Sequence, residues 1–282
     1  MKNELTKRQI RKRALRKKIV STLMLFSLIP SLALFAMVVN ANLGDESVSN
    51  KRESRSFSWQ LTEKQENKYR MERLQISPED VWKTLLVNGE NPVPKEHEMI
   101  LHYVEGDFLV DSRIVAPLQN MLNTMRDEGL SPLIVSAFRC YASQTTIFEN
   151  RVNALMNNGL TREQAISETS RVIAVPGTSE HQIGLAVDIV SLNYQNLTES
   201  FDQTAESRWL VNNSANFGFI LRYPKGTEHL TGIIYEPWHF RYVGVEVARY
   251  LTENNLTLEE FHSNPFFTVF QSQPHHVYIR DK

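Results

Sequence analysis

The segment GTSEHQIGLAVDIV, residues 177–190, decides how this chain is interpreted, because it places a charged residue inside an apolar run. Asp188 lies between Val187 and Ile189 in GLAVDIVSL, a run that predicts a buried strand. A buried carboxylate is costly unless it is paired or bound to a metal. His181, seven positions earlier, is the first candidate for a partner at such a metal site.

A second unusual cluster lies in GIIYEPWHFRYVG, residues 232–244, which predicts another strand and contains Glu236 and His239. A lone His or Asp on an apolar strand is usually structural, but the two clusters together favour a metal site. Two imidazoles and one carboxylate form the ligand set of a catalytic zinc site with a fourth position for water. His181, Asp188 and His239 supply this set, and Glu236 remains as a general base. Spacing alone leaves open whether Asp188 or Glu236 is the ligand.

The surrounding sequence predicts an α+β domain, with a small, mainly antiparallel sheet covered by helices. Apolar residues at three- and four-residue spacing predict a helix over 112–128, with Asp111 as its N-cap. Thr161 and Gln164 form a capping box, which predicts the start of another helix. The remaining expected elements are a short helix after Ser77, a strand at 133–138, a helix at 141–159, a helix before Gly218, a strand after it and a last helix from Gly244.

The N-terminus predicts a membrane anchor. Residues 1–18 form a basic segment that we expect to be cytoplasmic. Residues 19–39 form an uncharged run that is long enough for a membrane helix. We therefore expect a transmembrane anchor at 19–42 with the basic side in the cytoplasm and the rest outside. The alternative is a cleaved signal peptide, which also exports the chain. A linker at 43–75, a folded domain at 76–265 that contains both polar clusters, and a tail at 266–282 would follow.

The charge is divided unevenly between the two parts of the chain. Residues 1–18 hold nine of the 31 Lys and Arg and one of the 32 acidic residues, which leaves 22 basic and 31 acidic residues for the rest. An acidic body argues against nucleic acid as a partner. Cys140 is the single cysteine, so no internal disulfide forms, and an exported chain of this kind fits a bacterial envelope. We expect a monomer.

Three segments resemble the VanY-type zinc D-alanyl-D-alanine carboxypeptidases. They are SAFRCYASQ (136–144), PGTSEHQIGLAVDIV (176–190) and GFILRYPKGTEHLTGIIYEPWHFRYVG (218–244). The pattern S-x-H-x(6)-D followed by E-x-W-H is the metal and base signature of that family. The resemblance covers about residues 80–262 and excludes the basic segment, the anchor and the linker.

The resemblance implies a role for each residue of these motifs. The zinc ligands are expected to be three residues, which are His181, Asp188 and His239. Glu236 is expected to be the catalytic base, and Arg139 is expected to contact the substrate and stabilise the developing oxyanion. Three further residues are expected to line the substrate pocket or pack beside the metal, which are Ser179, Gln144 and Trp238.

These observations predict a membrane-anchored, exported zinc carboxypeptidase that removes the C-terminal D-Ala from peptidoglycan stem peptides. An L,D-carboxypeptidase that acts on tetrapeptide stems is the first alternative, since the same scaffold serves both. A non-catalytic cell-wall-binding module is the second alternative. Glu236 argues against it, because a binding module has no need of a base beside its metal.

Overall fold

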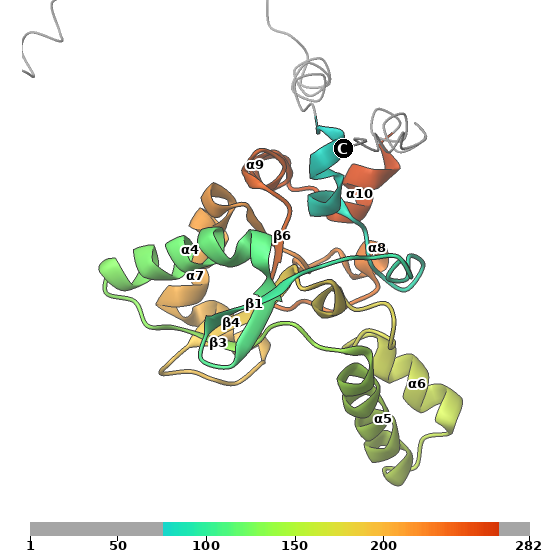
Figure 1. The fold of residues 1–282 in the computed structure, drawn as a ribbon. Coiled ribbons are helices and arrows are strands. Elements are labelled where there is room, and N and C mark those ends of the chain that lie inside the picture. Colours follow the sequence, from blue (N-terminus) through green and yellow to red (C-terminus); the bar gives the residue numbers. More distant parts are fainter. Residues whose placement is uncertain (1–75, 265–282) are drawn as a thin grey trace, which may run out of the picture. The chain divides into compact units, whose positions relative to one another are not determined.

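The computed structural model of the chain describes residues 76–264 (Figure 1). The predicted basic segment, membrane anchor, linker and C-terminal tail lie outside these residues. Within 76–264, no helix combines the length and the apolar character that a membrane crossing requires.

The centre of the domain is a four-stranded sheet in which every neighbouring pair is antiparallel. All six residues of its second strand are buried, as the apolar run around Asp188 predicts. A separate two-stranded hairpin, β1 with β2, lies near the sheet (Figure 1). The sheet strands, in spatial order, are β3 (Pro132–Ser136), β4 (Ala186–Ser191), β6 (His239–Tyr242) and β5 (Phe219–Leu221). The hairpin strands are β1 (Leu101–Glu105) and β2 (Phe108–Asp111).

Helix α4 (Val115–Asp127) supplies much of the main core, and its apolar spacing predicted this correctly. Leu118, Leu122 and Met125 are fully buried, while Val115 is half-buried. A second apolar cluster joins β5 to the last two helices. The helices of the C-terminal half are α7 (Ala205–Asn213), the short α8 (Glu228–Thr231), α9 (Val245–Asn254) and α10 (Leu258–Ser263).

Helices α5 (Tyr141–Asn157) and α6 (Arg162–Ser170) pack against each other as a hairpin that projects from the sheet (Figure 1). The predicted capping box is present, since Thr161 Oγ1 accepts from the Gln164 backbone N–H and Gln164 accepts from the Thr161 N–H. Phe148, Val152 and Ala165 form a small buried cluster of their own. The hairpin therefore has a core separate from that of the sheet.

Three details differ from the sequence-based expectations. The strand expected over 232–244 is only β6, because Pro237 lacks the N–H that a ladder needs. Ser77 precedes a 3₁₀ helix, η1 (Pro78–Thr84), and makes no side-chain cap. Asp111 caps the 3₁₀ turn η2 (Ser112–Ile114) rather than α4 itself. The α+β class with a small antiparallel sheet is confirmed.

Candidate active site

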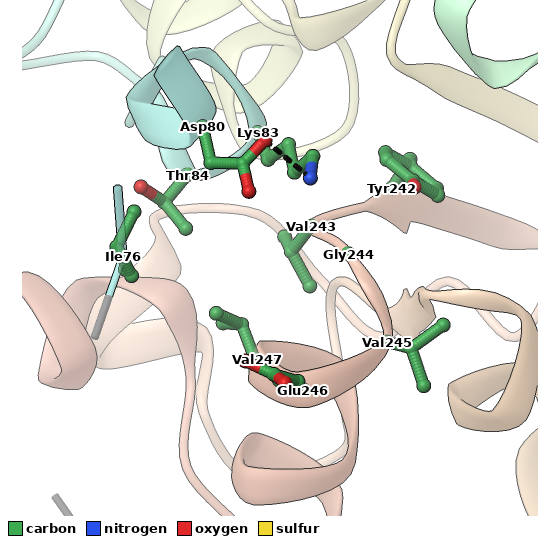
Figure 2. Close-up of a pocket in the computed structure, with 10 residues that line it drawn as sticks. All are labelled: Ile76, Asp80, Lys83, Thr84, Tyr242, Val243, Gly244, Val245, Glu246 and Val247. Carbon is green, nitrogen blue, oxygen red and sulfur yellow. Dashed lines mark ion pairs between the residues drawn. The ribbon is translucent and has the colours of Figure 1, made fainter. Parts of the chain in front are cut away.

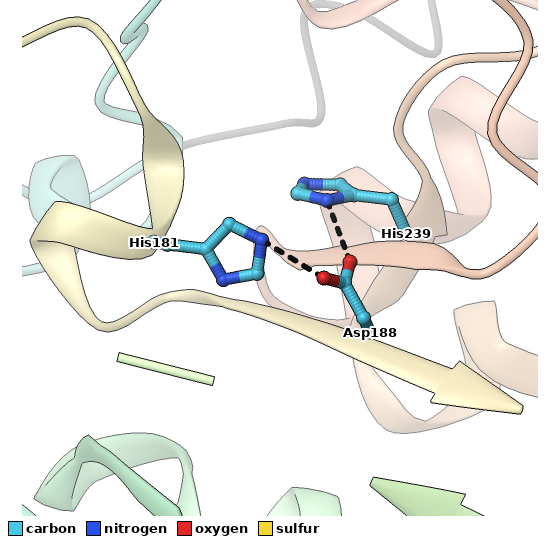
Figure 3. Close-up of side chains that lie close together, drawn as sticks. All are labelled: His181, Asp188 and His239. Atoms are coloured by element: carbon cyan, nitrogen blue, oxygen red, sulfur yellow. Dashed lines mark hydrogen bonds and ion pairs between the residues drawn. The ribbon is translucent and has the colours of Figure 1, made fainter. Parts of the chain in front are cut away.

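Three predicted ligands meet at the edge where a 3₁₀ turn joins the sheet (Figure 3). His181 lies in the turn η3 (Glu180–Ile183), Asp188 lies in the middle of β4, and His239 begins β6. All three are buried, and one ligand atom from each lies within 4.8 Å of the others. Among residues 76–264, this group has the composition and spacing to hold a metal ion.

Gly184 makes the approach between η3 and β4 possible. Its φ of +68° ends the turn in the left-handed region, which glycine adopts at little cost. A Cβ at this position would lie 2.9 Å from the Asp111 backbone nitrogen. The same backbone N–H donates to the Gly184 carbonyl oxygen at 2.9 Å, so the hairpin β1–β2 is fastened to the turn that carries His181.

The hydrogen bonds around each imidazole indicate which nitrogen faces a metal. His181 Nδ1 lies 2.7 Å from the Ala137 carbonyl oxygen, which can only accept, so this nitrogen carries the proton. The free Nε2 of His181 points to Asp188 Oδ2 at 3.3 Å. His239 Nδ1 lies 3.0 Å from Asp188 Oδ1. Asp188 therefore stands between His181 Nε2 and His239 Nδ1, which are the two nitrogens available as ligands.

The electrostatics of the site without a metal point the same way. Burial alone would raise the pKa of Asp188, but His181 and His239 hold it well below its usual range. Burial alone would lower the pKa of His239, but the neighbouring carboxylates of Asp188 and Glu180 raise it to about 9. The carboxylate and the two imidazoles therefore attract each other in the absence of a metal. Two imidazoles and one carboxylate are a donor set that fits zinc, which these three residues would hold.

Glu236 lies in the loop before β6, with Oε2 3.8 Å from His239 Nδ1. Burial raises its pKa to about 8, and Asp188 adds to this effect, while His239 and Arg139 oppose it. The group that could hold a metal includes Asp188 and not Glu236, which favours Asp188 as the carboxylate ligand. Glu236 remains a carboxyl group beside the ligands that is placed to exchange a proton with a water molecule in the site.

Arg139, just after β3, is held in place from two sides. Its two terminal nitrogens donate to Gln144 Oε1 and Ser136 Oγ, each at 2.8 Å. Gln144 is fully buried and donates in turn to the Ala174 carbonyl oxygen at 2.6 Å. The guanidinium is therefore oriented, and it lies 3.9 Å from Asp188 Oδ2. Gln144 is not a solvated helix residue but a support for Arg139.

A cavity of about 340 Å³ opens onto these groups. All eight predicted site residues line it, namely Arg139, Gln144, Ser179, His181, Asp188, Glu236, Trp238 and His239. Ser179 is buried and makes no side-chain cap to η3, so capping does not explain its presence. Ile147, Ile173 and Ile234 add apolar walls. The size and the mixture of apolar walls with a few polar groups are typical of a ligand site.

Two residues near the ligands were not predicted. The Tyr223 ring lies 4.8 Å from the His239 ring, and burial raises the pKa of its hydroxyl well above the usual value, so it stays neutral. Glu180 is buried beside His181 and contacts Arg222 and Arg241. The sequence did contain a signal for a buried acid. FILRYP and HFRY each place an arginine within an apolar segment, and a buried arginine needs an acidic partner.

A second cavity of about 340 Å³ lies between η1 and the connection from β6 to α9 (Figure 2). Its charged residues include Asp80 and Lys83, which form an ion pair with each other. Neither a histidine nor any predicted site residue lines this cavity. Of these two cavities, the one lined by His181, Asp188 and His239 therefore contains the candidate metal ligands.

Such a site is suited to metal-assisted hydrolysis, and comparison with known proteins agrees. A family model described as "VanY: D-alanyl-D-alanine carboxypeptidase" matches residues 107–245. A D-alanyl-D-alanine carboxypeptidase of Enterococcus faecalis is 39% identical over 65% of this chain and 66% of its own length. The putative carboxypeptidase YodJ of Bacillus subtilis is 37% identical over 66% of this chain and 68% of its own length. The chain belongs to the VanY family of D-alanyl-D-alanine carboxypeptidases.

Solved structures support the same relationship. VanYB in complex with D-alanine-D-alanine has a TM-score of 0.60 and 38% identity, covering 65% of this chain and 99% of that one. A VanY variant in complex with Zn(II) has a TM-score of 0.58 and 38% identity, covering 64% and 98%. The LdcB LD-carboxypeptidase has a TM-score of 0.54 and 35% identity, covering 65% and 84%. The fold therefore serves both D,D- and L,D-carboxypeptidases.

Proposed function

We propose that this chain is a zinc-dependent D-alanyl-D-alanine carboxypeptidase that removes the C-terminal D-Ala from peptidoglycan stem peptides. One observation carries the proposal: a buried His181–Asp188–His239 group shares its cavity with Glu236, a carboxylate whose pKa is raised to about 8. Family membership supplies the substrate class, and one zinc ion per chain fits the ligand set.

The residues around the metal position divide the work of hydrolysis. When bound, zinc supplies Lewis acidity and lowers the pKa of a water molecule to about 7. Glu236 accepts the proton of the attacking water and passes it to the leaving amine, because its carboxyl group lies in the same cavity as the three metal ligands. Arg139 donates to the developing oxyanion or to the substrate carboxylate, because its fork is already oriented by Ser136 and Gln144.

The remaining cavity residues bind the peptide. Gln144 fixes Arg139 through the 2.8 Å bond to its guanidinium, and Ser179 offers a hydroxyl at the cavity wall. Trp238 is buried, directly precedes the ligand His239 in the chain and lines the cavity. These apolar and polar surfaces suit a short peptide end with small side chains.

An L,D-carboxypeptidase that acts on tetrapeptide stems is the second candidate. The observation that favours it is the similarity to the LdcB LD-carboxypeptidase, at 35% identity. Every residue role would be retained, because both reactions hydrolyse the amide bond before a C-terminal D-Ala. A non-catalytic wall-binding module is disfavoured by Glu236, whose burial beside the ligands is costly without a proton-transfer role.

The cellular setting is also part of the proposal. A single membrane helix at 19–42 would hold the catalytic domain outside the cytoplasm of a bacterial cell, where peptidoglycan lies. The uncharged run at 19–39 behind nine basic residues supports this arrangement. The enzyme would act as a monomer and would not bind nucleic acid, given its acidic body.

The test is mass spectrometry of the products that the purified full-length chain releases from pentapeptide and tetrapeptide stems, with and without a zinc chelator. Loss of one D-Ala from the pentapeptide alone, abolished by the chelator, is the expected result. Cleavage of the tetrapeptide alone would assign the L,D-activity. Zinc binding without cleavage of either stem would contradict the enzymatic proposal.

A further inference from the structure

Glu180 is a fully buried carboxylate directly before the ligand His181, and two arginines hold one of its oxygens. Its Oε1 accepts from Arg222 Nε at 2.7 Å and from an Arg241 terminal nitrogen at 2.8 Å. Arg222 and Arg241 are themselves among the largest fully buried side chains of the described residues. Three charged groups have thus been placed in the interior together, at a considerable desolvation cost.

The arginines are fixed in turn by contacts beyond Glu180. Arg222 donates to both oxygens of Glu259, at 2.9 and 2.6 Å. Arg241 donates to the carbonyl oxygens of Lys83 and Leu85, at 3.1 and 2.8 Å. The planar forks of two arginines therefore define the position and the orientation of one carboxylate group.

The other oxygen of Glu180 is aimed at the metal site. Oε2 of Glu180 and Nε2 of His239 are both buried, and neither has a hydrogen-bond partner within the described part of the chain. They lie 3.6 Å apart, just beyond an ordinary N–H···O hydrogen bond. A small movement of the imidazole satisfies both atoms at once. The opposite ring nitrogen, Nδ1, is the one that faces Asp188.

We propose that Glu180 is a positioning residue of the metal centre, which accepts the Nε2–H of His239 and so leaves Nδ1 of that ring unprotonated toward the metal. A carboxylate behind a metal-bound histidine fixes both the tautomer and the ring orientation. This inference rests on the proposed zinc site and adds to it. It explains why a carboxylate and two arginines are buried behind the ligands rather than apolar side chains.

The substitution Glu180→Gln tests this role sharply. Both arginines are donors to Oε1, so the amide oxygen takes that place and the NH₂ group faces His239 Nε2. A donor then faces a donor, which drives the His239 proton onto Nδ1, where it blocks the metal. We expect the zinc dissociation constant of the full chain, measured by competition with a chromophoric chelator, to rise about 10–100-fold.

Glu259→Gln is the matched control. It removes an acid from the same arginine, Arg222, and makes no contact with His239. Its zinc dissociation constant should stay close to the wild-type value, although its unfolding midpoint falls. An equal loss of zinc affinity in both variants would overturn the inference, because the effect would then come from the arginine network as a whole.

A measurement on the unaltered protein covers the case in which Glu180→Gln does not fold. Nitrogen-15 histidine NMR of the zinc-loaded full chain should place the His239 proton on Nε2. A proton on Nδ1 would overturn the inference while leaving the proposed function intact, as would wild-type zinc affinity in a folded Glu180→Gln. A wild-type chain that binds no zinc would overturn both.

Discussion

Asp188 and His239 stand directly opposite each other on the antiparallel strands β4 and β6, and their side chains meet at 3.0 Å. On its other side, Asp188 pairs with Ser136 of β3, whose hydroxyl accepts from Arg139. Paired positions on three neighbouring strands therefore bring together the two ligands, Asp188 and His239, and Ser136, which holds Arg139. A shift of one residue in β4 would turn Asp188 to the opposite face, so strand register is a condition of the chemistry.

Removal of either imidazole should remove the metal. His181→Ala and His239→Ala each leave two ligands, too few to hold zinc in place of bulk water. Elemental analysis after gel filtration should find less than one zinc per chain in both variants. His229→Ala, an exposed histidine on α8, is the control and should keep its zinc. A full equivalent of zinc in either ligand variant would reject the assignment.

Glu236→Gln should separate metal binding from catalysis. The amide keeps the shape of the side chain but accepts no proton from water, so kcat should fall about 10²–10⁴-fold while zinc content and unfolding temperature hold. The comparison is Glu199→Gln, which also removes a carboxylate from the cavity wall. Glu199 is exposed to solvent and forms an ion pair with Lys225. Turnover close to wild type in Glu236→Gln would remove this residue from the mechanism.

Arg139→Lys should impair the reaction although the charge is kept. The guanidinium of Arg139 can donate to Ser136, Gln144 and a substrate oxygen at once, because its donors lie in one plane. A lysine ammonium lacks this planar set of donors, so kcat/KM should fall about 10²–10³-fold. Gln144→Ala should reduce kcat/KM in the same direction by a smaller factor, since it removes one support of the guanidinium. Ser143→Ala, at an exposed position one residue away, should leave steady-state kinetics unchanged.

Gly184→Ala should destabilise the fold beyond the cost of a positive φ. Gly159 also has a positive φ, of +98°, but a Cβ there meets nothing within 4 Å. Gly159→Ala therefore measures backbone strain alone, about 1–3 kcal/mol. Gly184→Ala adds a clash with the Asp111 backbone and should cost roughly 1–3 kcal/mol more in urea unfolding. Equal losses in the two variants would mean that this close approach is not tight in solution.

The contribution of Glu180 to stability should depend on pH. Burial opposes its charge, but Arg222, Arg241 and His239 lower its pKa far below the ordinary 4.5. Its stabilising effect is therefore complete above pH 4.5 and declines as the pH falls below that value. We expect the difference in unfolding free energy between metal-free wild type and Glu180→Gln to shrink on acidification from about pH 4.5 to about pH 3, because in this range Glu180 binds a proton in the unfolded chain but not in the folded one. A difference that grows instead would contradict this sign.

Local patterns with a clear physical cause were predictable from the sequence. The helix α4 follows from apolar spacing, and the start of α6 follows from the Thr161–Gln164 capping box. The eight site residues line one cavity because three short motifs lie at or beside β3, β4 and β6, which are neighbours in the same sheet. The burial of Asp188 was predicted from its apolar neighbours, and the ligand group at its side chain accounts for it.

Features that depend on distant contacts were not predictable. The hairpin β1–β2 was missed because its exposed residues, such as Tyr103, break the alternation of apolar and polar positions. The strand that contains His239 was predicted to be too long. The apolar residues within 232–236 lie in an irregular segment that lines the cavity and are not part of a strand. The arginines in FILRYP and HFRY indicate a buried acid, but only the fold shows that this acid is Glu180, which Arg222 and Arg241 contact from distant parts of the chain.

The separate core of the α5–α6 hairpin bears on how firmly the two halves of the site are held. Its buried apolar residues are Phe148, Val152 and Ala165, so its local opening breaks few apolar contacts compared with those of the sheet. The hairpin carries Gln144 and Ile147 of the cavity wall, whereas the metal ligands belong to the sheet and η3. Because Gln144 orients Arg139, the arginine depends on a packing unit that is separate from the one that holds the metal ligands, and the two halves of the site can lose their order independently.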